Sequence, residues 1–274
     1  MSSDPELVPR NALSGKRVAI SVSASSDLPR LGLDDAHLDL AVAELTRAIV
    51  VAGGSVVYGG GIGWGFTSIV LDEAERYGSP EGAFEHYVPY SEHADTPLED
   101  LRAYANRLSI KARVMLIDAN GAAHEVADAS AESFIRGEVA ASDSLTTMRR
   151  VTSEISDARV VLGGKVADFA GALPGVAEEA AATVAQGKPL YVAGGFGGAA
   201  TLVGRVSQPD LFDWLPDDLP AGLTAEVEDS VRQFLPGQLA EDGLSEDERA
   251  LLAQTNRPSD VATLSILGLS RLGL

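Results

Sequence analysis

Three glycine-rich segments, each placed directly after a short run of apolar and β-branched residues, most constrain the fold of this chain. They are Gly59-Gly60-Gly61, Gly163-Gly164 and Gly194-Gly195-Phe196-Gly197-Gly198. A strand that ends in glycine and leads into a helical stretch is typical of βαβ units, which build a mainly parallel sheet. We therefore expect an α/β fold with a mainly parallel sheet and helices on both of its faces.

Apolar periodicity predicts the individual elements. Two stretches have the spacing of a helix with one apolar face. The first has Leu38, Val42, Leu45 and Ile49 behind Asp34 and Asp35, and the second has Leu145, Met148, Val151 and Ile155 behind Ser142 and Asp143. The polar face of the second stretch would hold Arg150, with Arg149 at its edge. Six runs have the length and composition of strands: Arg17–Val22, Ser55–Tyr58, Phe84–Val88, Arg113–Ile117, Arg159–Leu162 and Pro189–Val192.

The chain of 274 residues is long enough to bury a core without disulfides. We expect an N-terminal extension over residues 1–15, a ligand-binding domain over 16–205, and a C-terminal helical extension over 206–274. The last segment contains too many apolar residues for a free tail, so it should dock on the domain or on a second subunit. These apolar residues are Leu251, Val261, Leu264, Ile266 and Leu269.

Charge and targeting signals limit the partners. The chain has 40 acidic and 21 basic residues, a formal charge of -19, which argues against nucleic acid as a partner. An anionic ligand is compatible with this surface, because helix N-termini and buried arginines act locally. Residues 1–10 lack the apolar core of a secretory signal, and no stretch of 18 residues stays apolar, so we expect a cytoplasmic protein without membrane contact.

Several chemistries are disfavoured by missing motifs. Gly164-Lys165 is followed by Val166, which lacks the hydroxyl of a magnesium-binding Walker loop. The third glycine segment has no acid at the spacing of a dinucleotide fingerprint, and no Gly-x-Ser-x-Gly elbow occurs. With no cysteine and no paired histidines, we predict no metal and no cofactor. The histidines, predicted to be surface or cap residues, are His37, His86, His93 and His124.

The glycine segments predict a phosphate site where strands end and helices begin, because glycine lets backbone N–H groups approach an anion. We call Tyr58–Thr67 the first glycine loop, Gly163–Gly175 the second and Gly194–Gly198 the third. In the first loop Thr67 would cap the next helix or contact the ligand. At the end of the second loop, Pro174 would start a helix with Glu178 and Glu179 near its positive end. The structural alternative is a tight turn in the first loop and ordinary dipole-complementing acids after the second.

The combination resembles a known family. The three loops, together with Met148-Arg149-Arg150 and Ser156-Asp157-Ala158-Arg159, are similar to the SLOG superfamily of Rossmann-like domains over roughly Lys16 to Arg205. This superfamily includes the Lonely-guy cytokinin-activating enzymes, the Smf-type proteins, and the sensor domains of melastatin-type channels and Thoeris-type antiphage effectors. The opening Ile20-Ser21-Val22-Ser23 fits the sensor branch.

The resemblance carries two functional implications. In the enzyme branch, a Pro-Gly-Gly-x-Gly-Thr-x-x-Glu loop and an upstream arginine support cleavage of an N-glycosidic bond. Here Gly163-Gly164-Lys165 is followed, after eight residues, by Pro174-Gly175-Val176-Ala177-Glu178-Glu179, which lacks the second Gly and the Gly-Thr. This departure favours the sensor branch, in which such a pocket binds ADP-ribose or cyclic ADP-ribose-like ligands and changes the assembly or activity of an effector.

We therefore predict a module that binds a nucleotide-derived ligand and forms a homo-oligomer, and that either acts on a separate effector protein or is an orphan module. The alternative is a nucleoside 5′-monophosphate phosphoribohydrolase-like enzyme with Glu178 or Glu179 as the catalytic acid. A third hypothesis is a structural or interaction protein on an inactive fold. The predicted ligand-binding residues are Ser23, Tyr58, Gly59, Gly60, Gly61, Thr67, Arg149, Arg150, Gly163, Gly164, Lys165, Pro174, Gly175, Glu178, Glu179, Gly194, Gly195, Phe196, Gly197 and Gly198.

Overall fold

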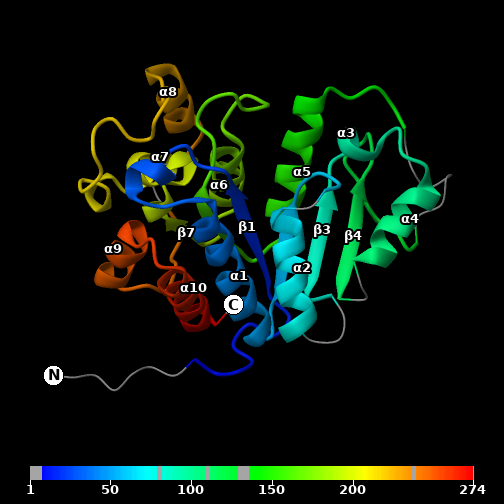
Figure 1. Ribbon diagram of the computed structural model, residues 1–274, viewed down its shortest axis with the longest axis horizontal. Helices are drawn as coiled ribbons and strands as arrows, with labels where there is room; N and C mark the ends of the chain where they lie inside the picture. Colours follow the sequence, from blue (N-terminus) through cyan, green and yellow to red (C-terminus); the bar gives the residue numbers. More distant parts are fainter. Residues whose placement is uncertain are drawn as a thin grey trace.

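The computed structural model describes residues 8–63, 65–78, 82–108, 111–128, 136–235 and 239–273. Within these residues seven strands form one sheet in the order β5-β4-β3-β2-β1-β6-β7 (Figure 1). All neighbouring strands are parallel except β4 and β5. The predicted α/β class, a Rossmann-like mainly parallel sheet, is confirmed. The strands are β1 (Arg17–Ser23), β2 (Ser55–Gly59), β3 (Phe84–Val88), β4 (Ala112–Ile117), β5 (Ala123–Glu125), β6 (Ala158–Gly163) and β7 (Leu190–Ala193).

The six predicted strands correspond to β1 to β4, β6 and β7, and each boundary lies within one residue of its prediction. Strand β5, which has three residues and pairs antiparallel to β4, was not predicted. Its sequence, Ala-His-Glu, has no apolar run. The turn between the two strands contains Asn120-Gly121, a dipeptide typical of hairpins, and this was the signal that could have identified it.

The first predicted helix is α1, and its sequence explains where it begins. Asp34 is the N-cap, and its side chain accepts a hydrogen bond from the backbone N–H of His37. The His37 ring in turn accepts a hydrogen bond from the backbone N–H of Asp34. All four apolar residues predicted on its face are completely buried. The helices are α1 (Asp35–Val51), α2 (Phe66–Tyr77), α3 (Tyr90–His93), α4 (Leu98–Arg107), α5 (Ala141–Ile155), α6 (Gly175–Ala185), α7 (Gly198–Ser207), α8 (Ala225–Phe234), α9 (Glu246–Gln254) and α10 (Pro258–Leu272), with short 3-10 turns at Leu28–Leu31, Gly194–Phe196 and Pro209–Leu211.

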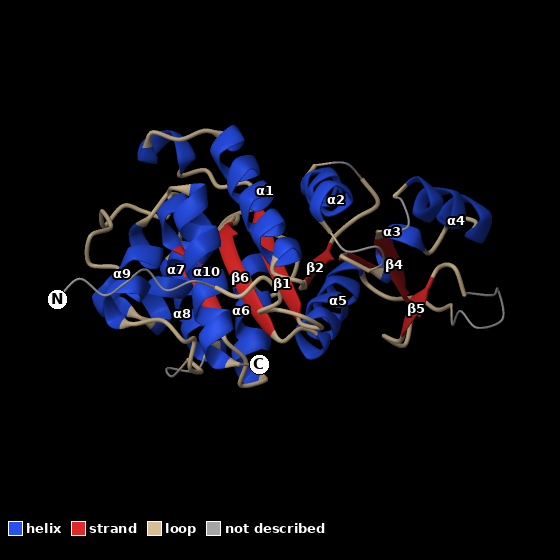
Figure 2. Ribbon diagram, turned by 90° about the horizontal axis from the view of Figure 1, so that it is seen from below, coloured by secondary structure: helices blue, strands red, loops and turns tan. Residues whose placement is uncertain are grey.

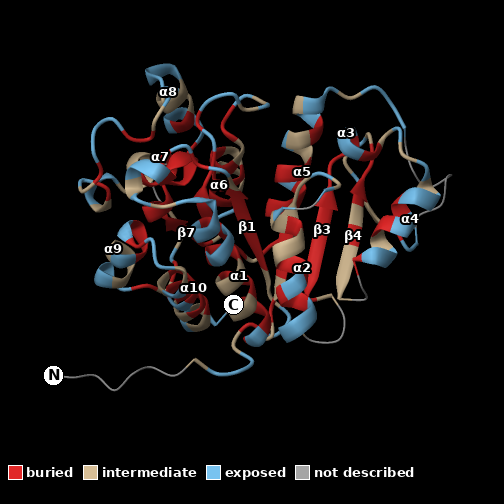
Figure 3. Cartoon of the chain, in the orientation of Figure 1, coloured by how far each residue is buried: buried red, intermediate tan, exposed pale blue. Residues whose placement is uncertain are grey.

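Helices cover both faces of the sheet. Helices α1 and α2 lie on one face, and α5 and α6 lie on the other (Figure 2). Strand alternation explains this arrangement: Ile20 of β1 packs in the core beneath α1, whereas its neighbour Ala19 packs beneath α5. The strands between the two layers are largely buried, while the outward sides of the helices are exposed (Figure 3).

The strand order creates a switch point beside β1. From β1 the chain builds β2, β3 and β4 on one side, and it later returns to add β6 and β7 on the other side. Ser23, the last residue of β1, pairs in register with Gly163, the last residue of β6. Ligands of open parallel sheets bind outside the carboxyl ends of the strands at such a point.

The C-terminal segment packs on the sheet and its helices. Helix α10 runs beside α1 (Figure 1), and Val261 and Leu269 are buried there. Between α9 and α10, the backbone at Thr255 lies so close to Gly195 that a Cβ at this glycine would overlap it. The C-terminal segment therefore shares the core of the domain over its described residues. The predicted domain boundaries stay predictions.

Candidate functional site

The first glycine loop leaves β2 in close contact with α5. A Cβ at Gly59 would overlap the thioether of Met148, so a larger residue at this position would have to displace that side chain. Gly60 donates its N–H to the carbonyl of Tyr87, 3.1 Å away. Tyr58 is stacked on His86, and burial raises the pKa of its hydroxyl, which therefore stays protonated. The loop residue Trp64 lies outside the described residues.

Helix α2 follows the first loop, and no side chain of the described residues caps its N-terminus. Its N-cap is Gly65, which has φ of 96° and no side chain to offer. Thr67, predicted either to cap this helix or to contact a ligand, is buried in its first turn and does not cap it. The first N–H groups of α2 are therefore not engaged by a capping side chain, unlike those of α1, which Asp34 caps.

The second glycine loop leaves β6 beside the end of β1. Gly163 and Gly164 have φ of 60° and 101°, and the Gly164 N–H donates to the carbonyl of Ser23 at 2.9 Å. Lys165 is exposed. Pro174 was predicted in the first turn of the next helix, but it is the N-cap of α6, which begins at Gly175 without a capping side chain.

Arg149 lies at the centre of this arrangement. It comes from α5 and was predicted at the edge of the polar face, but its side chain is only 10% exposed. This burial was not predicted, because helical periodicity does not show that α6 packs over this edge. The Arg149 guanidinium pairs with Glu178 and lies against Gly175, where a Cβ would be 2.7 Å from Nη2. Arg150, in contrast, is exposed and pairs with Glu154 on its own helix.

The two predicted acids differ in their contacts. Both Glu178 carboxylate oxygens are occupied, one by the Thr146 hydroxyl and the other by Arg149. The Glu179 side chain is 10% exposed and lies 3.6 Å from the Arg159 guanidinium. Among the described residues no side chain or backbone group donates a hydrogen bond to the Glu179 carboxylate. Glu179 thus keeps acceptor capacity that Glu178 has used.

Arg159 was predicted as a strand residue and not as a site residue. It is fully buried below Arg149 and Glu179, and this desolvation lowers the pKa of its guanidinium. An arginine within the otherwise apolar run Arg-Val-Val-Leu was the signal that could have marked it, because buried arginines are rare unless they are paired.

The third glycine loop is closed by the protein itself. The carboxylate of Asp27, completely buried, accepts the N–H of Gly198 at 2.7 Å, and the Gly164 carbonyl accepts the N–H of Ala199 at 2.9 Å. A Cβ at Gly194 would overlap the Phe212 ring. The predicted ligand-binding residues of this loop are all buried, and the first N–H groups of α7 already have acceptors.

The structure therefore brings only part of the predicted site together. Helix α5 links the first loop to the second, because Met148 contacts Gly59 while the adjacent Arg149 contacts Gly175. Ser23 meets the second loop at the switch point. Arg150 and Lys165 point to solvent, and the third loop packs inside the molecule.

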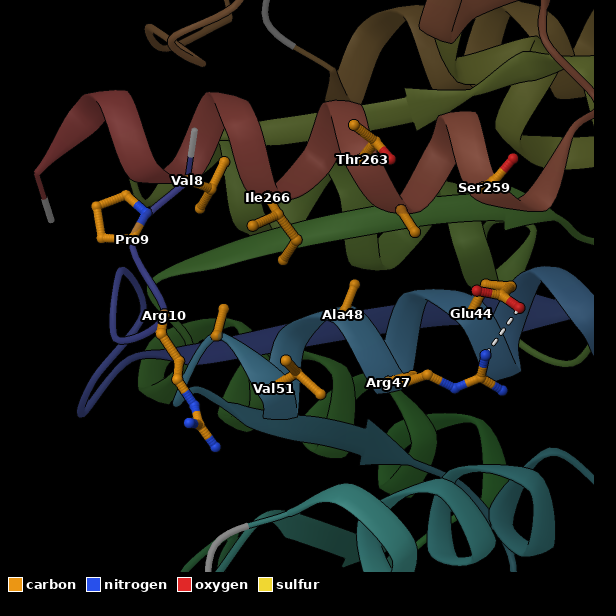
Figure 4. A pocket seen from close by; sticks show the side chains of 12 residues that line it. Val8, Pro9, Arg10, Glu44, Arg47, Ala48, Val51, Ser259, Thr263 and Ile266 are labelled. Carbon is orange, nitrogen blue, oxygen red and sulfur yellow. Dashed lines mark hydrogen bonds and ion pairs between the residues drawn. The ribbon is translucent and has the colours of Figure 1, made fainter. Parts of the chain in front are cut away.

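A separate hollow of about 390 Å³ lies on the opposite face of the sheet, between α1 and α10 (Figure 4). Val8, Ala48 and Ile266 point into it, and Arg10 lies at its rim. None of the residues that line this hollow belongs to the predicted ligand site.

The prediction for the histidines was wrong at two positions. His86 is completely buried between aromatic rings, and His93 is buried with its ring against the carbonyl of Ile117. The His86 ring contacts Tyr58 of β2, Phe84 of its own strand and Tyr104 of α4, and the His93 ring contacts Tyr90 of its own helix. Within the described parts of the chain, no group of three acidic or histidine side chains is placed to hold a metal ion, and no helix is long and apolar enough to cross a bilayer.

Comparisons with known proteins give one family. A family model described as SLOG cluster2 matches residues 12–248. Among solved structures, the X-ray structure of TM1055, a structural genomics target, is 18% identical with a TM-score of 0.38, and the match covers 70% of this chain and 81% of that chain. Comparison with the curated proteins gives no match. The family match contains all three glycine loops and continues past Arg205 into the C-terminal segment.

Proposed function

This chain belongs to the SLOG family, and we propose that it binds a phosphate-bearing, nucleotide-derived ligand between the first and second glycine loops. The observation that carries the proposal is the position of Arg149. Its buried guanidinium lies against the first residue of α6, so a fixed positive charge and a helix N-terminus meet at one point. Both features attract a phosphate, and they reinforce each other.

The capping pattern supports the same location. Among the described residues no side chain caps α2 or α6, which leaves the first N–H groups of both helices to ligand oxygens. The hydrogen bonds of Arg149 use only Nη1 among the described residues, which leaves the rest of its planar fork to a phosphate. The third loop does not belong to the proposed site, because Asp27 already occupies the N-terminus of α7.

The two glutamates of α6 indicate what the ligand carries next to its phosphate. We assign Glu179 as the acceptor for ribose hydroxyls, since both Glu178 oxygens are engaged. A phosphate next to a ribose fits ADP-ribose or its cyclic form, the ligand class that the family resemblance suggests. As a sensor, the chain would pass the binding event to a second copy or to a separate effector protein.

The test is a ligand panel of AMP, NAD, ADP-ribose and cyclic ADP-ribose, with adenosine as the control that lacks phosphate. Thermal shift and calorimetry measure binding, and chromatography measures released base. We expect stabilisation by at least one phosphate-bearing ligand, none by adenosine, and no released base. Absence of binding across the panel would contradict the proposal. Released base that disappears in Glu178→Ala or Glu179→Ala would replace it with the hydrolase alternative.

A further inference from the structure

A buried polar cluster lies directly beneath the proposed site, in the core between the sheet and helices α5 and α6. Its centre is Arg159 of β6, which is 1% exposed. Nε donates to the Thr183 hydroxyl at 2.7 Å, and Nη1 donates to the Ser21 hydroxyl at 2.6 Å. Nη2 donates to the hydroxyls of Ser153 and Thr152 at 3.0 and 3.2 Å. One side chain thus connects β1, β6, α5 and α6.

The partners of Arg159 continue the network to the residues of the site. The hydroxyls of Thr152 and Ser153 donate to the backbone carbonyl of Arg149 at 3.1 and 2.8 Å. On α6, the Thr183 hydroxyl donates to the carbonyl of Glu179 at 2.9 Å. Two hydrogen bonds therefore separate Arg159 from the backbone of each residue that we assign to the ligand.

The charge of Arg159 makes a role in packing alone a poor explanation. Its nearest carboxylate is that of Glu179, 3.6 Å away, beyond hydrogen-bond distance. Moving a guanidinium from water to this core is costly, and apolar residues of similar volume often fill such positions with equal or better stability. What an apolar side chain cannot supply is a planar fork that fixes the orientation of four hydroxyls on three elements.

We propose that Arg159 is a positioning residue of the ligand site, which holds α5 against α6 at the spacing that places Arg149 on Glu178 and on the first turn of α6. The inference rests on the proposed function, since it concerns the geometry of the same site. Arg159 does not touch the ligand; it acts through Arg149 and Glu179.

The test compares Arg159→Met with Arg113→Met. Arg113 serves as the control because it also lies near the start of a strand and pairs with acids, Glu125 at 2.6 Å and the buried Glu85 at 3.7 Å. It lies on β4, away from α5 and α6, and its side chain is 39% exposed. The first readout is the NMR signal of the Arg149 Nε–H group, which needs no ligand. We expect this signal to move in Arg159→Met and to keep its position in Arg113→Met.

The second readout is the affinity for ADP-ribose measured by calorimetry. We expect a loss of tenfold or more in Arg159→Met and less than twofold in Arg113→Met. Arg159→Lys, which keeps the charge but loses the planar fork, should restore part of the affinity, and it replaces the Met variant if that variant does not fold. An unchanged Arg149 signal in the folded Arg159 variant would overturn the inference. If the wild-type protein binds no ligand of the panel, the proposed function fails, and the NMR signal alone decides the role of Arg159.

Discussion

At the scale of residues, two adjacent arginines on α5 have opposite environments. Arg149 is buried against α6, whereas Arg150 is exposed. We predict that Arg149→Ala weakens binding of ADP-ribose by about 1–3 kcal/mol, roughly 5- to 150-fold, because a charge-assisted contact to phosphate is lost in a partly buried site. Calorimetry measures this change.

The matched control is Arg150→Ala, which replaces the neighbouring arginine of the same helix by alanine. Its affinity should stay within twofold of the wild type, since Arg150 is exposed and pairs with Glu154 on the solvent side of α5. Equal losses in the two variants would show that the net charge of α5, and not the position of Arg149, determines binding.

At the scale of elements, Gly175 at the start of α6 matters because it has no side chain that would displace Arg149, and not because its backbone conformation requires glycine. The nearest atoms to a Cβ at Gly175 would be those of the Arg149 guanidinium, the far end of a flexible side chain that can move. We predict that Gly175→Ala keeps or raises the free energy of unfolding, because alanine is the better helix former by up to about 1 kcal/mol. The same change should weaken ADP-ribose binding by displacing Arg149. Chemical denaturation and calorimetry separate the two effects.

Gly164→Ala provides the contrast within the same loop. Gly164 has φ of 101°, and a Cβ there would be 2.8 Å from Val176, so this variant should lose stability. A Gly175→Ala protein that is as unstable as Gly164→Ala would contradict the assignment of Gly175 to the ligand site.

At the scale of the whole molecule, buried histidines connect stability to pH. Burial lowers the pKa of His86 to about 4, from an ordinary value near 6.5. Between these pH values the unfolded chain binds the proton and the folded protein does not. The contribution of His86 to the free energy of unfolding is therefore complete above pH 6.5 and is lost as the pH falls toward 4. We predict a loss on the order of 3 kcal/mol from this group, measured by urea denaturation across this pH range.

His86→Phe removes the titrating ring and keeps an aromatic side chain beside Tyr58 and Phe84. The variant should show a smaller loss of unfolding free energy between pH 6.5 and 4 than the wild type. Some loss should remain, because burial also lowers the pKa of His93. A pH dependence identical to that of the wild type would show that His86 does not titrate in this range.

The sequence by itself determined the fold class and the positions of the six predicted strands. Local signals were sufficient for β1, whose residues alternate between two buried faces, and for α1, whose cap and apolar face lie within one short stretch. The order of the glycine loops along the chain also indicated the SLOG family, which the family match confirms. These features depend on neighbours in sequence, so no knowledge of packing was needed.

Only the tertiary structure decided which of the predicted site residues lie together. The three glycine loops look alike in sequence, but Asp27, 171 residues away from Gly198, closes the third loop. Likewise, α6 packing buries Arg149 and leaves Arg150 in solvent, and Arg159 joins elements that are distant along the chain. An anion site needs backbone N–H groups and side-chain donors that the protein itself has not fully used, and how many are used depends on contacts between distant segments, which local sequence patterns do not record.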